Sequence, residues 1–361
     1  MNKFLPRLIA WELTGSCNLK CVHCRASAVE KRDSDELTTQ EIRSTIDNIA
    51  SFSSPILILT GGEPLVREDV FEIARYGTEK GLRVVVGTNA TLITPEVAGK
   101  LLDAGVKRIS VSIDGSTPDA HDKFRGLSGA FENTLAGAKA AQEAGLDFQV
   151  NTTVTKRNVH DVQAIHDLAI ELGAVAHHIF LLVPTGRGED LKDEEISPEE
   201  YEKVLNWMYD MQKKADGRAP SSGHVQVFMK ATCAPHFFRV MDQRSKEEGI
   251  EVTADGAGLN ARTGGCLGGT GFCFISRTGD VNPCGYLPVS AGNIREQSFR
   301  EIWEDSVLFK DLRDPRKLKG KCGKCEYKVA CGGCRARAFA KYGDYLEAEP
   351  YCMYKPAGWK E

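Results

Sequence analysis

The chain contains 361 residues, of which 42% are hydrophobic and 27% are charged, and its net charge is −4 at pH 7. This length suffices for one large α/β domain and a smaller one. A slightly acidic chain carries no basic field for nucleic acid, and no apolar run approaches the roughly 20 residues of a membrane span. The N-terminus lacks the apolar region of a signal peptide, which predicts a cytoplasmic protein.

Apolar strands alternate with amphipathic helices from residue 7 to about residue 185. Strands are predicted at residues 8–13, 55–60, 82–87, 106–113, 147–154 and 174–183, and a capping box at Thr38 and Glu41 opens the first helix. Continuous apolar strands between helices indicate a covered parallel sheet. Six such units predict an α/β fold, a partial TIM-like barrel with its site at the carboxyl ends of the strands.

The composition predicts three segments. Residues 1–196 form the barrel, and residues 197–254 form a connector with a helix beginning at Pro198 and a short strand at residues 224–228. From about residue 255 the chain becomes rich in glycine and cysteine, so residues 255–361 are predicted to form a small separate domain.

Three cysteines lie close together directly after the first predicted strand. Cys17, Cys21 and Cys24 have x3 and x2 spacing, and thiolates are the usual ligands of iron–sulfur cubes. Three ligands leave one iron open, as in metal sites that perform chemistry. The alternatives are a zinc loop or disulfide cysteines, and twelve cysteines without a secretion signal disfavour the disulfides.

A glycine-rich turn follows the second predicted strand. Gly61 and Gly62 allow close approach of the backbone to a ligand, and the Glu63 carboxylate can accept from an ammonium group. By itself, the run from Gly61 to Pro64 could also be an ordinary turn.

Together, the cysteine loop and the glycine turn resemble those of the radical S-adenosylmethionine (SAM) enzymes. In that family SAM chelates the open iron of a [4Fe–4S] cluster, and an electron splits it into methionine and a 5′-deoxyadenosyl radical. The resemblance implies an external electron donor of the flavodoxin or ferredoxin type. It assigns SAM contacts to Gly61, Gly62, Glu63, Pro64, Thr88, Asn89, Ser112, Asp114, Arg125, Leu182 and Val183.

Within that set, Arg125 would meet the SAM carboxylate, because a guanidinium binds carboxylates in a bidentate way. Asn89 and Asp114 could instead be plain turn formers, and Leu182 and Val183, expected to flank adenine, could be core residues.

Eight cysteines between residues 266 and 352 resemble the SPASM domain, which carries auxiliary [4Fe–4S] clusters. The resemblance implies one cluster held by Cys266, Cys273, Cys284 and Cys334 and another held by Cys322, Cys325, Cys331 and Cys352. The spacing between Cys331 and Cys334 is x2 where many relatives have x3, which leaves the partition of these two open. A zinc ribbon or a purely structural role for the clusters are the alternatives.

Four stretches, at residues 24–28, 230–236, 263–273 and 283–289, resemble the AhbD family of haem synthases in the siroheme-dependent pathway. The resemblance implies an iron porphyrin substrate, Fe-coproporphyrin III, whose two propionates are oxidatively decarboxylated to vinyl groups. An auxiliary cluster could accept the surplus electron. A monomer is expected. The alternatives are a deacetylase of siroheme derivatives (AhbC- or NirJ-like), a SPASM peptide maturase and a non-enzymatic haem or cluster carrier.

A porphyrin with four propionates needs cations. Arg25, Arg187, Lys230 and Arg239 are candidates, although most such residues are solvated. His236 could ligate the substrate iron or be structural. Cys233 is left open as a core thiol, a residue beside a cluster or a substrate contact.

Overall fold

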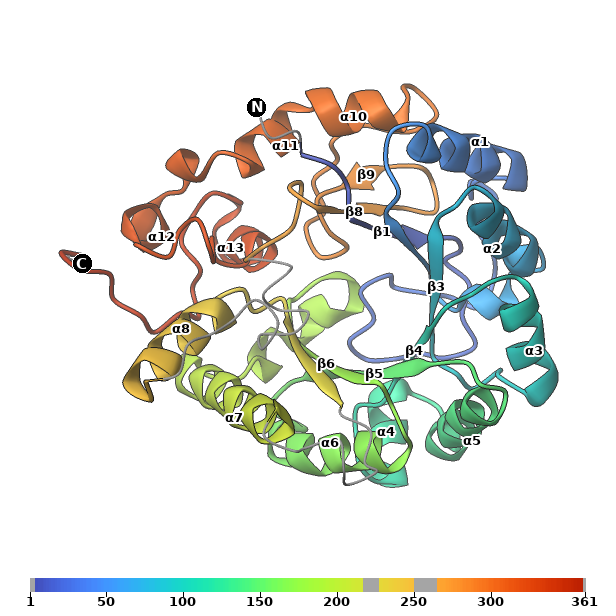
Figure 1. The fold of residues 1–361 in the computed structure, drawn as a ribbon, viewed down its shortest axis with the longest axis horizontal. Helices are drawn as coiled ribbons and strands as arrows, with labels where there is room; N and C mark the ends of the chain where they lie inside the picture. The colour runs from blue at the N-terminus through green and yellow to red at the C-terminus, as the bar shows by residue number, and fades with distance from the viewer. Residues whose placement is uncertain (1–3, 217–226, 250–264, 360–361) are drawn as a thin grey trace.

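A computed structural model of the chain describes residues 4–216, 227–249 and 265–359. One sheet of nine strands has the order β7-β6-β5-β4-β3-β2-β1-β8-β9. Neighbouring strands are parallel from β7 to β8, and only the β8–β9 pair is antiparallel. The strands surround an interior and the helices cover the outside (Figure 1).

The elements follow the predicted alternation through β6. The first strands and helices are β1 (Leu8–Glu12), α1 (Thr39–Ala50), β2 (Ile56–Thr60), α2 (Val70–Glu79), β3 (Arg83–Thr88), α3 (Pro95–Asp103) and β4 (Ile109–Ser112). Then come α4 (Pro118–Arg125), α5 (Ala130–Glu143), β5 (Phe148–Val154), α6 (Val162–Glu171) and β6 (Ala176–Leu181). The predicted partial barrel is confirmed, and Thr38 and Glu41 form the expected capping box.

Two further parallel strands extend the six predicted ones. After α7 (Pro198–Asp216), β7 (Phe228–Thr232) pairs with β6, and α8 (Phe237–Glu247) follows. β7 therefore begins at the last residue of the strand predicted at residues 224–228. Residues 224–226 lie outside the described residues. At the opposite edge, β8 (Phe272–Ile275) pairs with β1, and β9 (Val281–Asn282) forms a hairpin with it.

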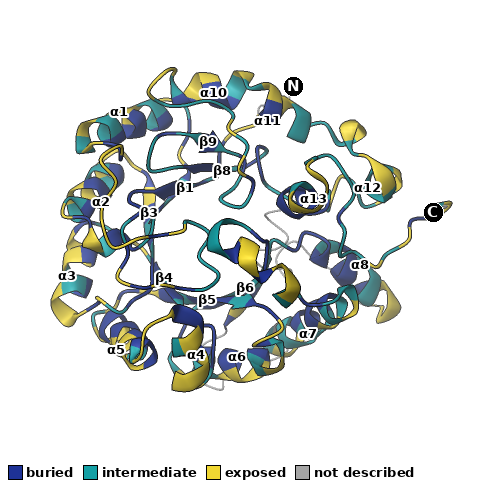
Figure 2. Cartoon of the chain, turned by 180° about the vertical axis from the view of Figure 1, so that it is seen from behind, coloured by how far each residue is buried: buried dark blue, intermediate teal, exposed yellow. Residues whose placement is uncertain are grey.

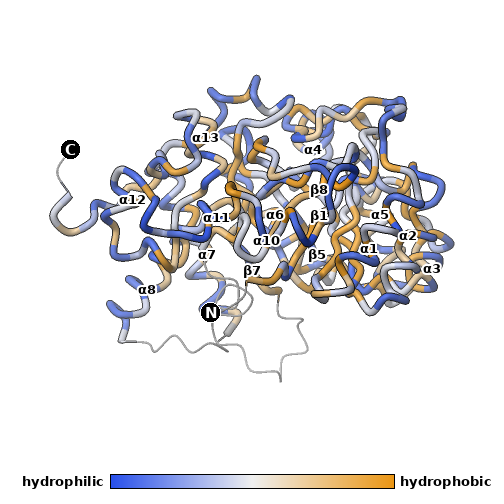
Figure 3. Tube along the Cα trace, turned by 90° about the horizontal axis from the view of Figure 1, so that it is seen from above, coloured by the Kyte–Doolittle hydropathy of each residue, from blue (hydrophilic) through white to orange (hydrophobic). Residues whose placement is uncertain are grey.

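Burial alternates along the strands of the sheet. In β2, Leu57 and Leu59 are fully buried against the helices, whereas the residues between them are half-buried and face the barrel interior. The strands are dark and the outward helix faces bright in the burial view (Figure 2). Hydrophobic stretches concentrate along the strands (Figure 3). The interior face at the carboxyl ends of the strands is therefore free to form a site.

The cysteine-rich segment shares its core with the barrel. Helices α10 (Phe299–Asp305) and α11 (Val307–Leu312) bury Phe299, Trp303 and Phe309 in the same hydrophobic cluster as Trp11 of β1. The other α-helices described in this segment are α12 (Gly320–Lys324) and α13 (Arg335–Tyr342). The division into three domains remains a prediction, but strands from all three predicted segments lie in one sheet. Within the described ranges no helix has the length and apolarity to cross a membrane.

Substitution of Trp303 by alanine tests this shared core. The indole is fully buried, lies 5.2 Å from the Phe309 ring centroid and donates a hydrogen bond to the Phe4 carbonyl over 3.0 Å. We expect Trp303→Ala to lower the free energy of unfolding by about 3–5 kcal/mol, measured by denaturant unfolding followed by circular dichroism. The control Val307→Ala, whose side chain is 74% exposed, should change it by less than about 0.5 kcal/mol. Equal effects of the two substitutions would contradict the shared core.

Candidate active site

A pocket opens at the carboxyl ends of β2 to β6, where the cysteine loop meets the barrel interior. Its empty space, about 930 Å³ including the part open to solvent, suits a ligand of cofactor size. The predicted residues that line it are Cys17, Cys21, Cys24, Gly61, Gly62, Thr88, Asn89, Ser112 and Arg125, together with the candidate cation Arg25. Residues that line it without being predicted include Leu19, His23, Thr60, Ser110, Asn151, Thr153, Phe180 and Tyr286.

Four of these eight missed residues share one pattern. Ser110, Asn151, Thr153 and Phe180 occupy the half-buried, interior-facing positions of their strands. Polar residues alternate there with buried ones, a signal of period two that is visible in the sequence. Tyr286 carries no such signal, because it reaches the pocket from the loop after β9.

The three thiols of the cysteine loop are arranged to hold a charged group. Each sulfur lies within hydrogen-bonding distance of an N–H donor: Leu19 N at 3.3 Å from Cys17 Sγ, Ala28 N at 3.4 Å from Cys24 Sγ, and Arg125 Nη1 at 3.8 Å from Cys21 Sγ. Burial raises the pKa of Cys17 to about 12 and also raises that of Cys21. Iron bound there would favour the thiolates over the protonated thiols. The loop therefore fits an iron–sulfur cluster.

The glycine turn packs directly on the cysteine loop. Gly62 N–H donates to the Thr14 carbonyl over 2.7 Å, and Glu63 N–H donates to the Ser16 carbonyl over 2.8 Å. A Cβ at Gly62 would lie 2.2 Å from the Ser16 oxygen, and one at Gly61 would lie 2.6 Å from the Thr14 oxygen. Both positions therefore require glycine for the loop to approach the end of β2.

Glu63 lies behind the pocket wall and joins it to β3. Its carboxylate accepts from Leu65 N at 3.1 Å, Thr88 Oγ1 at 2.8 Å and Asn89 N at 2.7 Å. Burial raises its pKa to about 7, against the effect of these donors. An ammonium group bound beside it would favour the charged form. Pro64 is buried in the following 3-10 turn, Pro64–Val66, and is not a lining residue of the pocket.

A buried ion pair also contributes one side chain to the pocket lining. Arg125 pairs with Asp114, which also accepts from Thr153 N over 2.7 Å. Desolvation raises the pKa of Asp114 in spite of the arginine. Arg125 faces the pocket, whereas Asp114 is buried behind it. The His23 ring packs on Phe124 with its centroid 4.4 Å away, and its Nδ1 is buried without a partner.

Leu182 and Val183, predicted to flank adenine, lie behind the pocket. Both are buried, and Val183 packs with Leu287, Cys334 and Ala336. The side chain that β6 presents to the pocket is Phe180.

The candidate porphyrin-binding cations are mostly engaged within the protein. Arg25 bonds Glu12 over 2.8 Å at the edge of the pocket. Arg187 donates to the carbonyls of Cys21 and Ala28 over 3.0 and 2.6 Å, so it holds the cysteine loop.

The other candidate residues lie away from this pocket. Arg239 pairs with Glu202 over 2.5 Å. Lys230 pairs in register with His178 in the sheet, and burial lowers its pKa. His236 is buried and stacks on Tyr201 with centroids 4.6 Å apart.

Seven of the eight C-terminal cysteines fall into two groups. Cys322, Cys325, Cys331 and Cys352 line a second pocket, together with His236 and Arg239. Cys284 and Cys334 pack in a separate cluster, and Cys266 lies near both. Cys273, predicted to join them, is instead buried in the barrel core.

No group of three His, Cys, Asp or Glu side chains converges on a single metal ion in the part of the chain that the structure describes. An iron–sulfur cube, unlike a single ion, binds each thiolate at a different iron atom. Its ligands therefore do not have to converge on one point.

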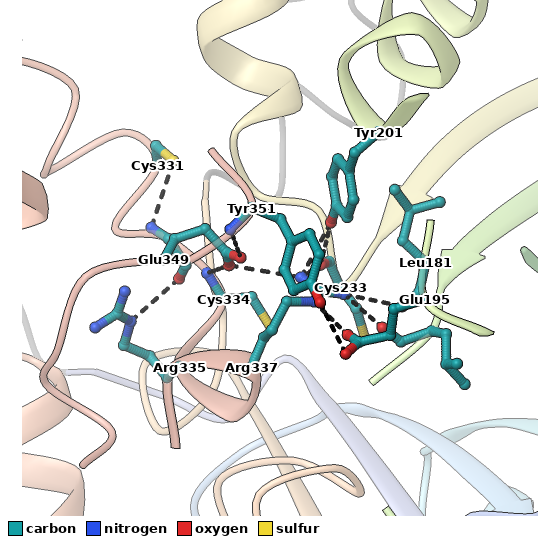
Figure 4. Close-up of polar contacts among 12 residues, drawn as sticks. Leu181, Glu195, Tyr201, Cys233, Cys331, Cys334, Arg335, Arg337, Glu349 and Tyr351 are labelled. Atoms are coloured by element: carbon teal, nitrogen blue, oxygen red, sulfur yellow. Dashed lines mark hydrogen bonds and ion pairs between the residues drawn. The ribbon is translucent and has the colours of Figure 1, made fainter. Parts of the chain in front are cut away.

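Arg337 of α13 joins the C-terminal segment to the barrel (Figure 4). It is 1% exposed and donates to the carbonyls of Leu181, Leu182 and Cys233 over 3.1, 3.0 and 2.9 Å. Glu349 lies 3.5 Å from the guanidinium and accepts from Cys334 N over 2.8 Å. Nothing in the local sequence distinguishes Arg337 from a surface arginine.

A parallel barrel with a three-cysteine loop beside a glycine turn defines an enzyme that binds a [4Fe–4S] cluster and SAM. The profile of the Radical SAM superfamily matches residues 11–169, and that of the SPASM iron-sulfur cluster-binding domain matches residues 266–326. The chain is 59% identical to the AdoMet-dependent heme synthase of Methanosarcina barkeri, over 97% of each chain. It therefore belongs to the radical SAM family with a SPASM domain that includes these heme synthases.

One further relative and one solved structure place the chain more broadly. It is 34% identical to the Fe-coproporphyrin III synthase of the same organism, over 96% of this chain and 87% of the relative. Streptococcus suis SuiB bound to S-adenosylmethionine has a similar fold, with a TM-score of 0.74 and 17% identity over 97% of this chain and 78% of SuiB.

Substitution of Gly62 by alanine tests the packing of the cysteine loop on the glycine turn. The new methyl group would displace the Ser16 carbonyl and Cys17, so we expect loss of most iron at that loop. We expect 5′-deoxyadenosine formation to fall by on the order of 100-fold. Gly99→Ala in α3, where a Cβ meets open space, should keep normal iron and activity. Normal iron in the Gly62 variant would contradict this role of the turn.

Removal of the Arg187 side chain tests whether it holds the loop. Arg187→Ala removes two hydrogen bonds to loop carbonyls, each worth about 1–3 kcal/mol for a charged donor. We expect a chelator to remove iron from this site faster than from the wild type, and the loss is followed over time by absorbance under anaerobic conditions. Arg157→Ala, which breaks only a half-exposed pair with Glu194, should release iron at the wild-type rate. Equal release from both variants would show that Arg187 does not hold the loop.

Proposed function

We propose that this enzyme converts Fe-coproporphyrin III to haem by oxidative decarboxylation of two propionates to vinyl groups. The observation that carries the proposal is the 59% identity over nearly the whole length of a named heme synthase, together with a pocket in which the cysteine loop faces a space of ligand size. The lower identity of 34% to a Fe-coproporphyrin III synthase supports this reaction over the removal of acetate side chains.

When bound, the reduced cluster and SAM supply a radical that removes a hydrogen atom from an unactivated carbon. For each propionate, the β-carbon loses one hydrogen atom and the carboxylate leaves as carbon dioxide. The two side-chain carbons then share a double bond, and one electron passes to an acceptor. The reaction therefore balances only with a one-electron acceptor, and the C-terminal iron–sulfur domain supports the presence of one.

The chain's own residues supply binding and orientation in this proposal. Thr88 and Asn89 line the pocket and bond to Glu63 behind them, an arrangement that suits the amino group and ribose of SAM, and Arg125 suits its carboxylate. Arg25, which lies over the Phe274 ring at 4.3 Å, is the candidate for a propionate. Phe180 and Tyr286 provide flat apolar surfaces in the same lining.

Anaerobic turnover tests the proposal directly. Reconstituted protein is incubated with SAM, dithionite and Fe-coproporphyrin III, and porphyrins and 5′-deoxyadenosine are followed by mass spectrometry. We expect monovinyl and divinyl products together with 5′-deoxyadenosine, and neither from the Cys17, Cys21 and Cys24 to alanine variant. 5′-Deoxyadenosine without any change in the porphyrin would refute this substrate, and siroheme derivatives and peptides would be assayed next.

A further inference from the structure

Cys273 faces away from the other C-terminal cysteines. It lies in β8, where successive side chains point to opposite faces of the sheet. The next residue, Phe274, therefore points to the other face, where it lies under the Arg25 guanidinium at 4.3 Å. Cys273 is fully buried in the hydrophobic cluster that contains Trp303 and Phe309 of the outer helices. The strand itself therefore separates its thiol from the C-terminal cluster sites.

Without Cys273, the group of Cys266, Cys284 and Cys334 lacks a fourth ligand, and Cys233 lies beside this group. It follows β7 directly and has a φ of 58°, which non-glycine residues rarely adopt without support. Its carbonyl accepts hydrogen bonds from Tyr201 Oη and Arg337 Nη1, both over 2.9 Å. These two buried donors hold the backbone in this conformation (Figure 4). The Cys233 side chain packs against the buried cluster that contains Cys334.

The remaining two cysteines complete the group. Cys233, Cys284 and Cys334 belong to one packed cluster. Burial raises the pKa of Cys266 and Cys284, and the nearby Cys334 raises the pKa of both further. Each of the four thiols thus has at least two of the others as neighbours, and four thiolates ligate a [4Fe–4S] cluster fully.

We propose that Cys233, Cys266, Cys284 and Cys334 ligate one auxiliary [4Fe–4S] cluster, and that Cys273 is a core residue with no metal. Tyr286 packs against this group and also lines the SAM pocket, so this cluster lies beside the wall of the active site. The second group, Cys322, Cys325, Cys331 and Cys352, lines the other pocket. The inference depends on cluster binding by the SPASM domain and holds whichever porphyrin is the substrate.

Two matched cysteine substitutions test the assignment in the full chain. Cys233→Ala and Cys273→Ala are reconstituted anaerobically, and iron and sulfide are determined per chain. Electron paramagnetic resonance of the dithionite-reduced proteins gives a second readout. The SAM-dependent change in the signal of the Cys17, Cys21 and Cys24 cluster serves with circular dichroism as the folding control. Cys233→Ser adds a variant that keeps a possible oxygen ligand.

We expect Cys233→Ala to lose about four irons per chain and one resonance signal, while the SAM-dependent signal persists. Cys273→Ala should keep wild-type iron and all signals, and Cys233→Ser should shift the affected signal or lose it. Full iron in Cys233→Ala would overturn the proposal. An equal loss of iron from folded Cys273→Ala would overturn it as well, because Cys273 would then be required at the cluster.

Discussion

Two backbone hydrogen bonds between the end of β2 and the cysteine loop determine the geometry of the whole pocket. They join Gly62 to Thr14 and Glu63 to Ser16, and they can form only because neither Gly61 nor Gly62 carries a side chain. Glu63 extends the connection to Thr88 and Asn89 at the end of β3. The carboxyl ends of three neighbouring strands are thereby fixed to the thiols, so a shift of any one of them displaces the others.

Features encoded within a short stretch of sequence could be predicted, and those that depend on distant pairing could not. The cysteine loop, the glycine turn and six strands follow from local spacing and periodicity. Pairing of β8 with β1 joins residues at opposite ends of the chain, and only this register shows that Cys273 faces the outer helices. Likewise, Arg187 resembles a surface residue until its contacts with the loop carbonyls are known.

Charge in the pocket is almost fully compensated by the protein itself. Arg125 faces Asp114 and Arg25 faces Glu12, and both carboxylates are buried. An anionic ligand that bound either guanidinium would have to share it with a carboxylate or displace that carboxylate, and a buried unpaired carboxylate is costly. Anions that leave the existing pair intact are therefore favoured, since a guanidinium has five N–H donors to distribute.

The pairing of β1 with β8 also bears on how the chain folds during synthesis. Glu12 at the end of β1 bonds Arg277 just after β8, although the two residues are 265 positions apart. At about 5–20 residues per second, roughly 13–50 s pass between the appearance of one partner and that of the other. During this interval β1 has an unpaired, hydrophobic edge, which is the kind of surface that aggregates. The nascent barrel therefore needs protection, by a chaperone or by its own later residues, until the C-terminal segment emerges.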